Sequence, residues 1–429
     1  MTAKTIIPLV LPPDATVVVP GSKSFTNRVL VTAALAVGRS TLRGVLFSDD
    51  TAAMLSCLES LGIATAIDRT ACVVEVDGCG GALPRSAADV NVGQSGTTAR
   101  FIAPLLALGH GSFRIDGDPQ MRARPMGDLV RALLDLGVRV EGTAEADRLP
   151  LTVSANGVPG GEISVPGDVS SQFLSGLLLS APCFAAGLTV KVVGDLVSKP
   201  YVDMTIATMT AFGAHVDRHA YESFTVAPGG YSAANYVIEP DASAASYFFA
   251  AAAITGGRVR IEGLGTGALQ GDVAFVDILA SMGVRVVQTA DATEVDATGL
   301  APGELRGVDV DMAHCSDTAQ TLAAVAVFAN GPTRVRGIGF IRRKETDRIA
   351  AVVTELRRCG IRAEETDDGF TVYPGTPRAT RVATYDDHRM AMSFSLLGLK
   401  VPGISIENPG CVAKTFPLFF EVLETLRRG

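Results

Sequence analysis

Tryptophan is absent from the 429 residues of the chain, and aromatic side chains make up only 6% of them. Charged residues are also few, at 19%, whereas 47% of the residues are hydrophobic. A disordered chain is thereby excluded, because such chains combine low hydrophobicity with high charge. The acidic residues outnumber Lys and Arg by 45 to 37, a net charge of −8, which gives no sign of a general nucleic-acid binder.

The seven cysteines form no CxxC pair, and they do not cluster with histidine at the spacing of a zinc site. The N-terminus lacks the basic start and the clean apolar run of a signal peptide. The longest uncharged stretch, residues 169–190, is interrupted by glycine and proline, and it fits a buried helix and strand better than a membrane span. These absences predict a cytoplasmic protein with no membrane segment.

Six copies of one unit are present in the sequence. In each copy a polar or glycine-rich cluster runs into an apolar, helix-like stretch. The copies are marked, at intervals of 73, 75, 72, 74 and 70 residues, by Lys23, Gly96, Ser171, Ser243, Asp317 and Asp387. A second series of residues, each in the position of a helix C-cap glycine, is Gly62, Gly137, Gly213, Gly283 and Gly360. Because an alternating strand follows most of these glycines, the unit is predicted to be β-α-β-α-β-β.

The sixth copy stops at Gly429, before the strands with which the other copies end. Segments 5–11 and 16–20 precede the first helix and can supply the missing strands, so the N-terminus is expected to pair with the C-terminal half. Three copies then form an N-terminal domain over residues 20–238. The other three form a second domain over residues 1–19 and 239–429.

Several predicted helices begin with cationic residues, although acidic residues are normally favoured there. Lys23 and Arg28 lie in or near the first turns of the first helix, and Arg389 helps to open the last. Lys344 and Arg348 are four residues apart, on one helix face if that stretch is already helical, where like charges cost about 0.2–0.5 kcal/mol. An anion bound between the two cations would make their arrangement favourable. Helix N-termini, with their free N–H groups, are suited to bind anions. The sequence therefore predicts a pocket for a substrate with more than one anionic group.

Other candidates are weaker when each is taken alone. Helix starts with neutral donors or glycine contain Ser24, Gly96, Ser170, Ser171 and Gln172. Residues that could equally be solvated or capping groups are Arg122, Arg124, Ser198, Tyr201 and Lys414. Asp317 could be only an N-cap, and Glu345 could pair with Arg348. The glycines of residues 263–271, GLGTGALQG, open no βαβ unit of the dinucleotide-binding kind.

Eight segments, taken in order, resemble the motifs of the 5-enolpyruvylshikimate-3-phosphate (EPSP) synthase family. They are PGSKSFTNR, SGTTARF, MRARPM, SSQFLSGLLL, SKPYVD, KETDR, DDHRMAM and AKTFP, and they span essentially the whole chain. The resemblance implies the enolpyruvyl transferase fold, an α/β fold of two inside-out α/β barrel domains with six βαβαββ repeats, three per domain. It also implies an active site in the interdomain cleft, a monomer, and no metal or organic cofactor.

The implied reaction transfers the enolpyruvyl group of phosphoenolpyruvate to the 5-hydroxyl of shikimate 3-phosphate and releases phosphate. It proceeds by addition and elimination through a tetrahedral intermediate. This is the sixth step of the shikimate pathway, which leads to chorismate and the aromatic amino acids. Both substrates carry phosphate and carboxylate groups, in agreement with the predicted anion pocket.

The resemblance also assigns roles to residues that match the family motifs. Those implied to contact shikimate 3-phosphate are Lys23, Ser24, Arg28, Ser170, Ser171, Gln172, Ser198, Tyr201, Asp317 and Lys344. Those implied to contact phosphoenolpyruvate are Lys23, Gly96, Arg124, Gln172, Arg348, Arg389 and Lys414. Asp317 is implied to accept the proton of the 5-hydroxyl, and Glu345 to protonate the methylene carbon and later take a proton back. Lys23 and Lys344 are implied to be catalytic, in contact with both substrates or the intermediate.

Two positions depart from the family pattern. Gln94 stands where the family usually has Asn, and we expect the longer amide to shift the loop that carries Gly96. Phe340 stands where relatives often have Asn, so a hydrogen bond to the shikimate substrate is expected to be lost or replaced by backbone. Gly96 itself matches relatives that are sensitive to glyphosate, which is therefore expected to inhibit in competition with phosphoenolpyruvate.

Two other functions stay open from the sequence. The enolpyruvyl transferase that acts on UDP-N-acetylglucosamine shares the fold and the chemistry, but it typically has Lys-Asn after the first strand and a cysteine in a mobile loop. Here Ser24 follows Lys23, and residues 118–125 contain no cysteine. A non-catalytic anion-binding scaffold would keep the arginines and serines but would need neither Asp317 nor Glu345.

Overall fold

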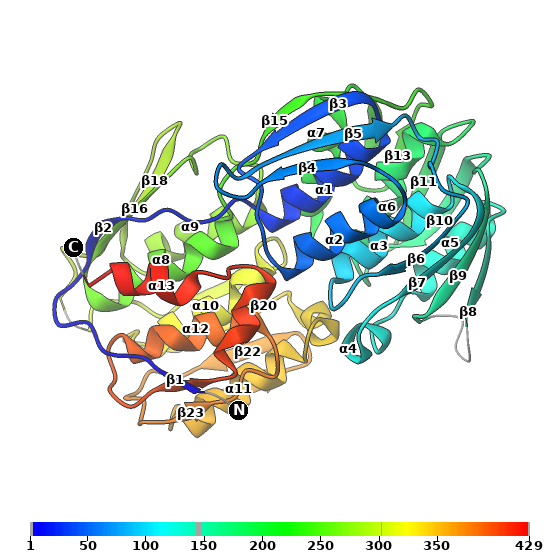
Figure 1. The fold of residues 1–429 in the computed structure, drawn as a ribbon. Coiled ribbons are helices and arrows are strands. Elements are labelled where there is room, and N and C mark those ends of the chain that lie inside the picture. Colours follow the sequence, from blue (N-terminus) through cyan, green and yellow to red (C-terminus); the bar gives the residue numbers. More distant parts are fainter. Residues whose placement is uncertain (1–2, 143–147, 302, 428–429) are drawn as a thin grey trace. The chain divides into compact units, whose positions relative to one another are not determined.

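The computed structural model describes residues 3–142, 148–301 and 303–427 of the chain. The chain divides into two compact units. We call Gly21–Ile238 the N-terminal unit, and Met1–Pro20 together with Glu239–Gly429 the C-terminal unit. Within each unit the sheets lie outside and helices fill the interior (Figure 1).

In the described residues the N-terminal unit carries three sheets, and each contains a parallel pair that continues into antiparallel strands. The first sheet consists of β3 (Ala36–Arg43), β4 (Thr65–Asp68), β5 (Val73–Cys79), β14 (Tyr231–Ser232) and β15 (Asn235–Val237). The second consists of β6 (Ala87–Asn91), β7 (His110–Asp116), β8 (Arg139–Gly142) and β9 (Leu151–Asn156). The third consists of β10 (Gly161–Pro166), β11 (Leu188–Val193), β12 (Val216–His219) and β13 (Ser223–Val226).

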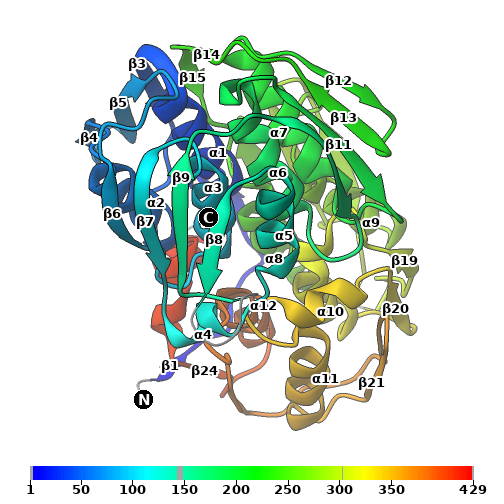
Figure 2. The same cartoon turned by 90° about the vertical axis from the view of Figure 1, so that its right-hand side faces the viewer.

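The helices of the N-terminal unit fall into two kinds. The interior helices, with nearly every residue buried, are α1 (Lys23–Leu35), α3 (Gly96–Leu106) and α6 (Ser171–Ser180). The others, of which several have one exposed side, are α2 (Asp49–Ser60), α4 (Pro119–Arg122), α5 (Gly127–Asp135), the 3-10 turn η1 (Ala181–Cys183) and α7 (Lys199–Ala211). Figure 2 shows the strands of this unit wrapped around its interior helices. A helix that is apolar on all sides is stable only inside a protein, which explains this layering.

In the C-terminal unit, sheets of the same kind are formed with the help of the N-terminus. The first consists of β2 (Asp14–Thr16), β16 (Arg258–Glu262), β17 (Arg285–Gln288) and β18 (Ala292–Asp296). The second consists of β19 (Asp309–Asp311), β20 (Thr333–Arg336), β21 (Ala363–Thr366) and β22 (Gly369–Val372). The third consists of β1 (Ala3–Thr5), β23 (Arg381–Val382) and β24 (Ser405–Glu407).

The pairing of the N-terminus with the C-terminal half is confirmed, but the predicted bounds of its two strands are wrong. Strand β1 runs antiparallel to β24, and β2 runs parallel to β16. Both strands end at or near the residue where the prediction began. Residues 6–11 are apolar but bind β-partners only at scattered positions, such as the amide of Ile6 on the carbonyl of Ile404 at 2.9 Å. Hydrophobicity alone therefore misplaced these strands by two or more residues.

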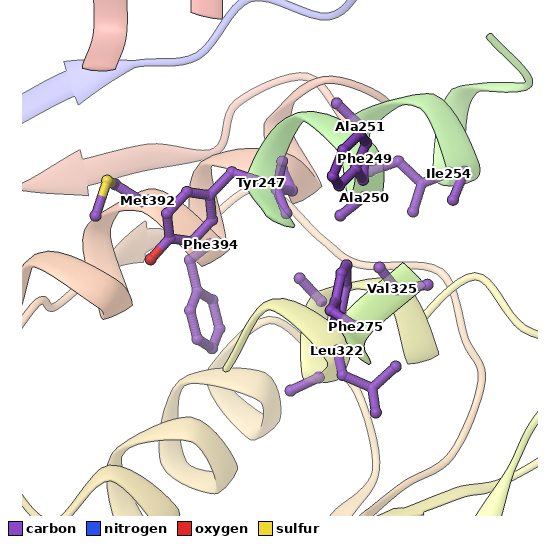
Figure 3. Packing of buried hydrophobic residues seen from close by; sticks show 14 of the residues in the cluster. Tyr247, Phe249, Ala250, Ala251, Ile254, Phe275, Leu322, Val325, Met392 and Phe394 are labelled. Carbon is purple, nitrogen blue, oxygen red and sulfur yellow. The ribbon is translucent and has the colours of Figure 1, made fainter. Parts of the chain in front are cut away.

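The interior of the C-terminal unit is formed by α8 (Ala242–Thr255), α10 (Ala319–Ala326) and α12 (His388–Gly398), in which almost every residue is buried. Figure 3 shows Tyr247, Phe249 and Ile254 of α8 near side chains of α10 and α12. The remaining helical segments are η2 (Gly271–Ala274), α9 (Phe275–Ser281), η3 (Ser316–Thr318), η4 (Gly339–Arg343), α11 (Arg348–Arg358), η5 (Pro409–Lys414) and α13 (Phe419–Thr425). The six helices predicted from the repeats are thus confirmed as the interior helices of the described chain, and with them the inside-out α/β build.

The predicted helix ends are also confirmed. The glycines at the ends of α2, α5, α7, α9 and α11 all have a left-handed backbone, with φ values of 84°, 80°, 87°, 106° and 83° at Gly62, Gly137, Gly213, Gly283 and Gly360. Only glycine adopts this conformation readily, so these residues end the helices. Among the described residues, no helix is both long and apolar enough to cross a membrane, and residues 169–190 contain α6, η1 and the start of β11.

A test of this packing comes from the contact of α3 with α6. At Gly176 of α6, an added Cβ atom would lie 2.2 Å from the carbonyl oxygen of Arg100 in α3. We expect Gly176→Ala to destabilise the protein by about 1–3 kcal/mol, because the backbones must separate to admit the methyl group. Thermal unfolding followed by circular dichroism measures this loss.

The matched control is Gly267→Ala, where no atom lies within 4 Å of the added Cβ. We expect this variant to change stability by less than about 0.5 kcal/mol. If both variants unfold at the wild-type temperature, the two helices do not pack as closely as described.

Candidate active site

A buried arginine organises the charged residues of the C-terminal unit. Arg348 is the first residue of α11, and its side chain is only 2% exposed. Its Nε donates to Oδ2 of Asp387 at 2.8 Å, its Nη2 to Oε2 of Glu345 at 2.8 Å, and its Nη1 to Oδ1 of Asp317 at 3.1 Å. Burial disfavours the charge of Arg348, but these carboxylates outweigh that effect and raise its pKa.

A second arginine approaches Asp317 from the start of α12. Asp387 is the N-cap of this helix and accepts a hydrogen bond from the backbone amide of Arg389 at 2.9 Å. The Nη2 of Arg389 donates to Oδ2 of Asp317 at 2.6 Å. Each oxygen of Asp317 is therefore bound by a different arginine, and the N-cap of α10 is Thr318. The alternative of Asp317 as a simple N-cap is wrong.

The condition under which Lys344 and Arg348 would share a helix face is not met. Lys344 ends the 3-10 turn η4, and α11 begins only at Arg348, so the two residues do not share a helix face. The Nζ atom of Lys344 lies 5.9 Å from the centroid of the Phe340 ring, within range of a cation–π interaction. Phe340, half-buried against the hydrophobic core of this unit, thus contacts a predicted catalytic lysine.

Lys414 is the remaining predicted cation of the C-terminal unit. It ends η5, which packs on α12, and it is 4% exposed. Asp317 and Glu345, in contrast, are 18% and 11% exposed, so their carboxylates keep some access to solvent. The structure therefore brings Asp317, Glu345, Arg348 and Arg389 into one connected group.

In the N-terminal unit, Arg28 of α1 connects several predicted residues. It is 1% exposed, and its guanidinium donates to the carbonyl oxygens of Ser24 and Tyr201, both at 2.9 Å, and to Oγ1 of Thr205 at 2.8 Å. Burial, which no carboxylate of the described residues compensates here, lowers the pKa of Arg28 to about 10. Lys23, at the start of the same helix, forms an ion pair with Asp50 at 3.4 Å.

Gly96 lies where two guanidinium groups approach the start of α3. An added Cβ atom would lie 2.2 Å from Nη1 of Arg100 and 2.6 Å from Nη1 of Arg124. Arg100 also donates to Oε1 of Gln172 at 3.1 Å, which connects α3 with the start of α6. The predicted residues Gly96, Arg124 and Gln172 are therefore close together, and Arg100 joins them.

The predicted serines lie at two further helix starts, and Arg122 lies elsewhere. Ser170 is the N-cap of α6 and accepts from the amide of Gln172 at 3.3 Å, while Ser171 is the first helical residue. Ser198, with a left-handed backbone, precedes α7. Arg122 is half-exposed and donates to Asp116 at 2.8 Å. This contact is an ion pair at the protein surface.

Sequence reasoning missed some residues of these groups. Arg100 follows Gly96 by four positions in a matched motif, and Asp387, used above only as a repeat marker, precedes the predicted Arg389 by two positions. Both could have been found by asking which polar residues lie one helical turn or two positions from a predicted site residue. No three His, Cys, Asp or Glu side chains in the described ranges are placed to hold a metal ion.

This geometry permits two kinds of chemistry. Arginines and lysines at helix starts bind phosphate and carboxylate groups, and arginine does so with two parallel hydrogen bonds. The carboxylates of Asp317 and Glu345 can exchange protons with a ligand that reaches Arg348, because all three side chains are in direct contact.

Comparison with known proteins gives a consistent result. A family model described as EPSP synthase (3-phosphoshikimate 1-carboxyvinyltransferase) matches residues 12–423. A 3-phosphoshikimate 1-carboxyvinyltransferase of Nostoc punctiforme is 48% identical over 418 residues, which cover 96% of this chain and 97% of that protein. The enzyme of the same name from Trichormus variabilis is 47% identical over 410 residues, 95% of each chain.

Solved structures show the same relationship. An EPSP synthase from Acinetobacter baumannii superposes with a TM-score of 0.83 at 25% identity and covers 99% of this chain and 98% of its own. These matches confirm the predicted fold class and the resemblance found in the eight motifs. The chain belongs to the EPSP synthase family.

Proposed function

We propose that the chain transfers the enolpyruvyl group of phosphoenolpyruvate to the 5-hydroxyl of shikimate 3-phosphate, with release of phosphate. The observation that carries this function is the contact of Arg348 with both Asp317 and Glu345 in a chain of this family. An anion-binding scaffold needs the arginine but gains nothing from two partly exposed carboxylates beside it. A reaction that moves protons needs all three.

Shikimate 3-phosphate and phosphoenolpyruvate would be bound by the cations and hydroxyls at the helix starts of both units. In this proposal shikimate 3-phosphate is bound by Lys23, Ser24, Arg28, Ser170, Ser171, Gln172, Ser198, Tyr201 and Lys344. Phosphoenolpyruvate is bound by Lys23, Gly96, Arg124, Gln172, Arg348, Arg389 and Lys414. The planar guanidinium matches the geometry of carboxylate and phosphate, which supports arginine in these positions. That both groups of residues serve one substrate pair, and that the enzyme is a monomer, stay predictions.

The proposed chemistry moves two protons. Glu345 protonates the methylene carbon of phosphoenolpyruvate, which makes the adjacent carbon electrophilic. The 5-hydroxyl oxygen bonds to that carbon while Asp317 takes the hydroxyl proton, and a tetrahedral intermediate forms. Glu345 then takes a proton back from the new methyl group as the bond to phosphate breaks.

Substrate binding would prepare Glu345 for the first of these steps. In the structure Arg348 donates to Glu345 at 2.8 Å, which favours the ionised carboxylate. A carboxylate of phosphoenolpyruvate that binds Arg348 would compete for this donor and add negative charge nearby. Both effects raise the proton affinity of Glu345, so its carboxyl group becomes protonated when the substrate binds.

Replacement of either carboxylate tests the proposal. We expect Glu345→Gln and Asp317→Ala to lower the turnover number by at least about 100-fold, since a positioned acid or base contributes about 10²–10⁴-fold. The rate of phosphate release from the two substrates is measured, and circular dichroism checks that both variants stay folded.

The control is Glu421→Gln, which removes an exposed carboxylate from the first turn of α13. It should release phosphate at the wild-type rate. Near-normal turnover in Glu345→Gln or Asp317→Ala would contradict the assigned proton transfers. Wild-type binding of shikimate 3-phosphate without any turnover would favour the scaffold, and turnover of UDP-N-acetylglucosamine in its place would favour the other transferase.

Gly96 allows a second test, which uses glyphosate. We expect glyphosate to compete with phosphoenolpyruvate in the wild-type enzyme. A methyl group at Gly96 would push against Arg100 and Arg124. Gly96→Ala should therefore weaken the binding of both phosphoenolpyruvate and glyphosate, by about tenfold or more for one added methyl group. The KM for phosphoenolpyruvate and the inhibition constant of glyphosate are measured, with Gly267→Ala as the control. Noncompetitive inhibition, or wild-type constants in Gly96→Ala, would contradict this placement.

A further inference from the structure

A buried carboxylate that the reaction does not use lies behind the Asp317–Arg389 pair. Asp272 belongs to the short turn η2, at the end of the glycine-rich segment GLGTGALQG, and is 5% exposed. This turn packs against α8 and η3, the two elements that carry Ser243 and Asp317. The glycines of this segment open no dinucleotide-binding unit, so the sequence assigns the segment no function.

A chain of hydrogen bonds connects Asp272 with the proposed proton acceptor. Ser243 Oγ donates to Oδ2 of Asp272 in a short hydrogen bond. The same Oγ atom lies 3.4 Å from Nη2 of Arg389, which donates to it. That Nη2 atom also donates to Oδ2 of Asp317 at 2.6 Å. Asp272 therefore fixes the hydroxyl that helps to orient Arg389.

The other carboxylate oxygen of Asp272 is in an environment that is unfavourable for a negative charge. Its Oδ1 atom is buried and has no hydrogen-bond partner among the described residues. Burial, and secondly the charge of Asp317, raise the pKa of Asp272 to about 7. A buried carboxylate with one free oxygen costs stability when it is ionised. Such a cost is typical of residues kept for function.

We propose that Asp272 is a positioning residue for the proposed reaction: through Ser243 it holds Arg389 against Asp317, and it places a second negative charge beside that base. The inference deepens the proposed function and rests on it. An ionised Asp272 raises the proton affinity of Asp317, because two nearby negative charges disfavour each other. Asp317 then takes the 5-hydroxyl proton more readily, while Arg348 and Arg389 keep it ionised.

The other charged groups around this pair act in known directions. Asp272 faces Asp241 at the N-cap of α8, Asp317 in η3 and Arg389 of α12, and the charge of Arg389 opposes the rise of its pKa. Cys315, also nearby, stays neutral because burial and the Asp272 charge raise its pKa to about 12. Asp317 faces Arg348 and Arg389 directly, with Glu345 bound to the same Arg348. Asp277 of α9 is exposed and adds a more distant negative charge.

The test compares the pH dependence of turnover in four forms of the full-length chain: wild type, Asp272→Asn, Ser243→Ala and Asp277→Asn. Asp272→Asn removes the charge with little change of shape, so the pKa of Asp317 falls. We expect turnover at pH 8 to drop about threefold or more, and the acid limb of the pH profile to move to lower pH by about half a unit or more.

The other two variants separate charge from geometry. Ser243→Ala leaves the charge of Asp272 in place and removes the bridge to Arg389. It should raise the KM for phosphoenolpyruvate with little movement of the acid limb, because Arg389 is a proposed ligand of that substrate. Asp277→Asn, the matched control on the neighbouring helix, should have the wild-type profile.

A stability measurement tests the same coupling without any activity. The raised pKa means that folded Asp272 holds its proton more tightly than the unfolded chain, so the wild type loses stability as the pH rises through about 7. That loss begins at about pH 4, where the carboxyl of the unfolded chain ionises, and is complete at about pH 7. Asn has no such loss. The Tm of Asp272→Asn relative to wild type should therefore increase between about pH 5 and pH 7, and this increase should level off at lower pH in the Asp317→Asn background.

Three results would overturn the inference. Wild-type turnover and an unmoved acid limb in Asp272→Asn would show that its charge does not act on Asp317. Lower turnover with a lower Tm at every pH and an unchanged profile would show a purely structural residue. A Tm difference between Asp272→Asn and the wild type that does not change with pH would alone exclude the electrostatic coupling of Asp272 with Asp317. A wild-type chain that releases no phosphate refutes instead the proposed function, and the stability arm then decides the coupling alone.

Discussion

The contact between one buried arginine and the carboxylates of three different segments holds the charged centre of the C-terminal unit together. Arg348 binds Glu345 in the segment between η4 and α11, Asp317 of η3, and Asp387 at the start of α12. The three segments come from neighbouring repeats, so the geometry of each depends on the same side chain. Breaking a buried ion pair by removing one partner is strongly unfavourable, because the other charge stays behind without compensation. Arg348 therefore fixes where the acids lie relative to one another.

The inside-out build explains why such a centre can form at helix starts. Six interior helices are buried on almost all sides, and they are rich in Ala, Ser and Thr, which permits close approach of backbones, as Gly176 does against Arg100. Closely packed helices leave little space for large aromatic side chains, in agreement with the low aromatic content of the chain. Because the sheets lie outside, the helices meet inside each unit (Figure 1). In the proposed function, the N-termini of these helices bind the charged substrates, since a helix N-terminus favours anions.

Local patterns in the sequence predicted the repeats, the interior helices and the glycines that end helices such as Gly62, because each depends on residues within one or two turns. The family motifs added the candidate residues. The contact of Glu345 with Arg348, three positions away, was foreseen from the sequence. The distant contacts were beyond prediction: Arg348 and Asp387 are 39 positions apart, and Arg28 and Thr205 are 177 positions apart. Whether Lys344 lies in the helix of Arg348 was left open, because like charges at this spacing carry no signal of where a helix begins. Such contacts depend on how the repeats pack.

The two units differ in what their buried arginines contact, and this difference bears on catalysis. Arg28 donates to hydroxyl and carbonyl oxygens, so a bound anion there meets a cation that no carboxylate in the described part of the chain has neutralised. Arg348 and Arg389 donate to carboxylates, so an anion that binds them must compete with Asp317 and Glu345. Competition weakens binding, but it also raises the proton affinity of the displaced acid. An arginine that neutralises an acid before substrate binding thus links binding to proton transfer, which an isolated arginine does not do.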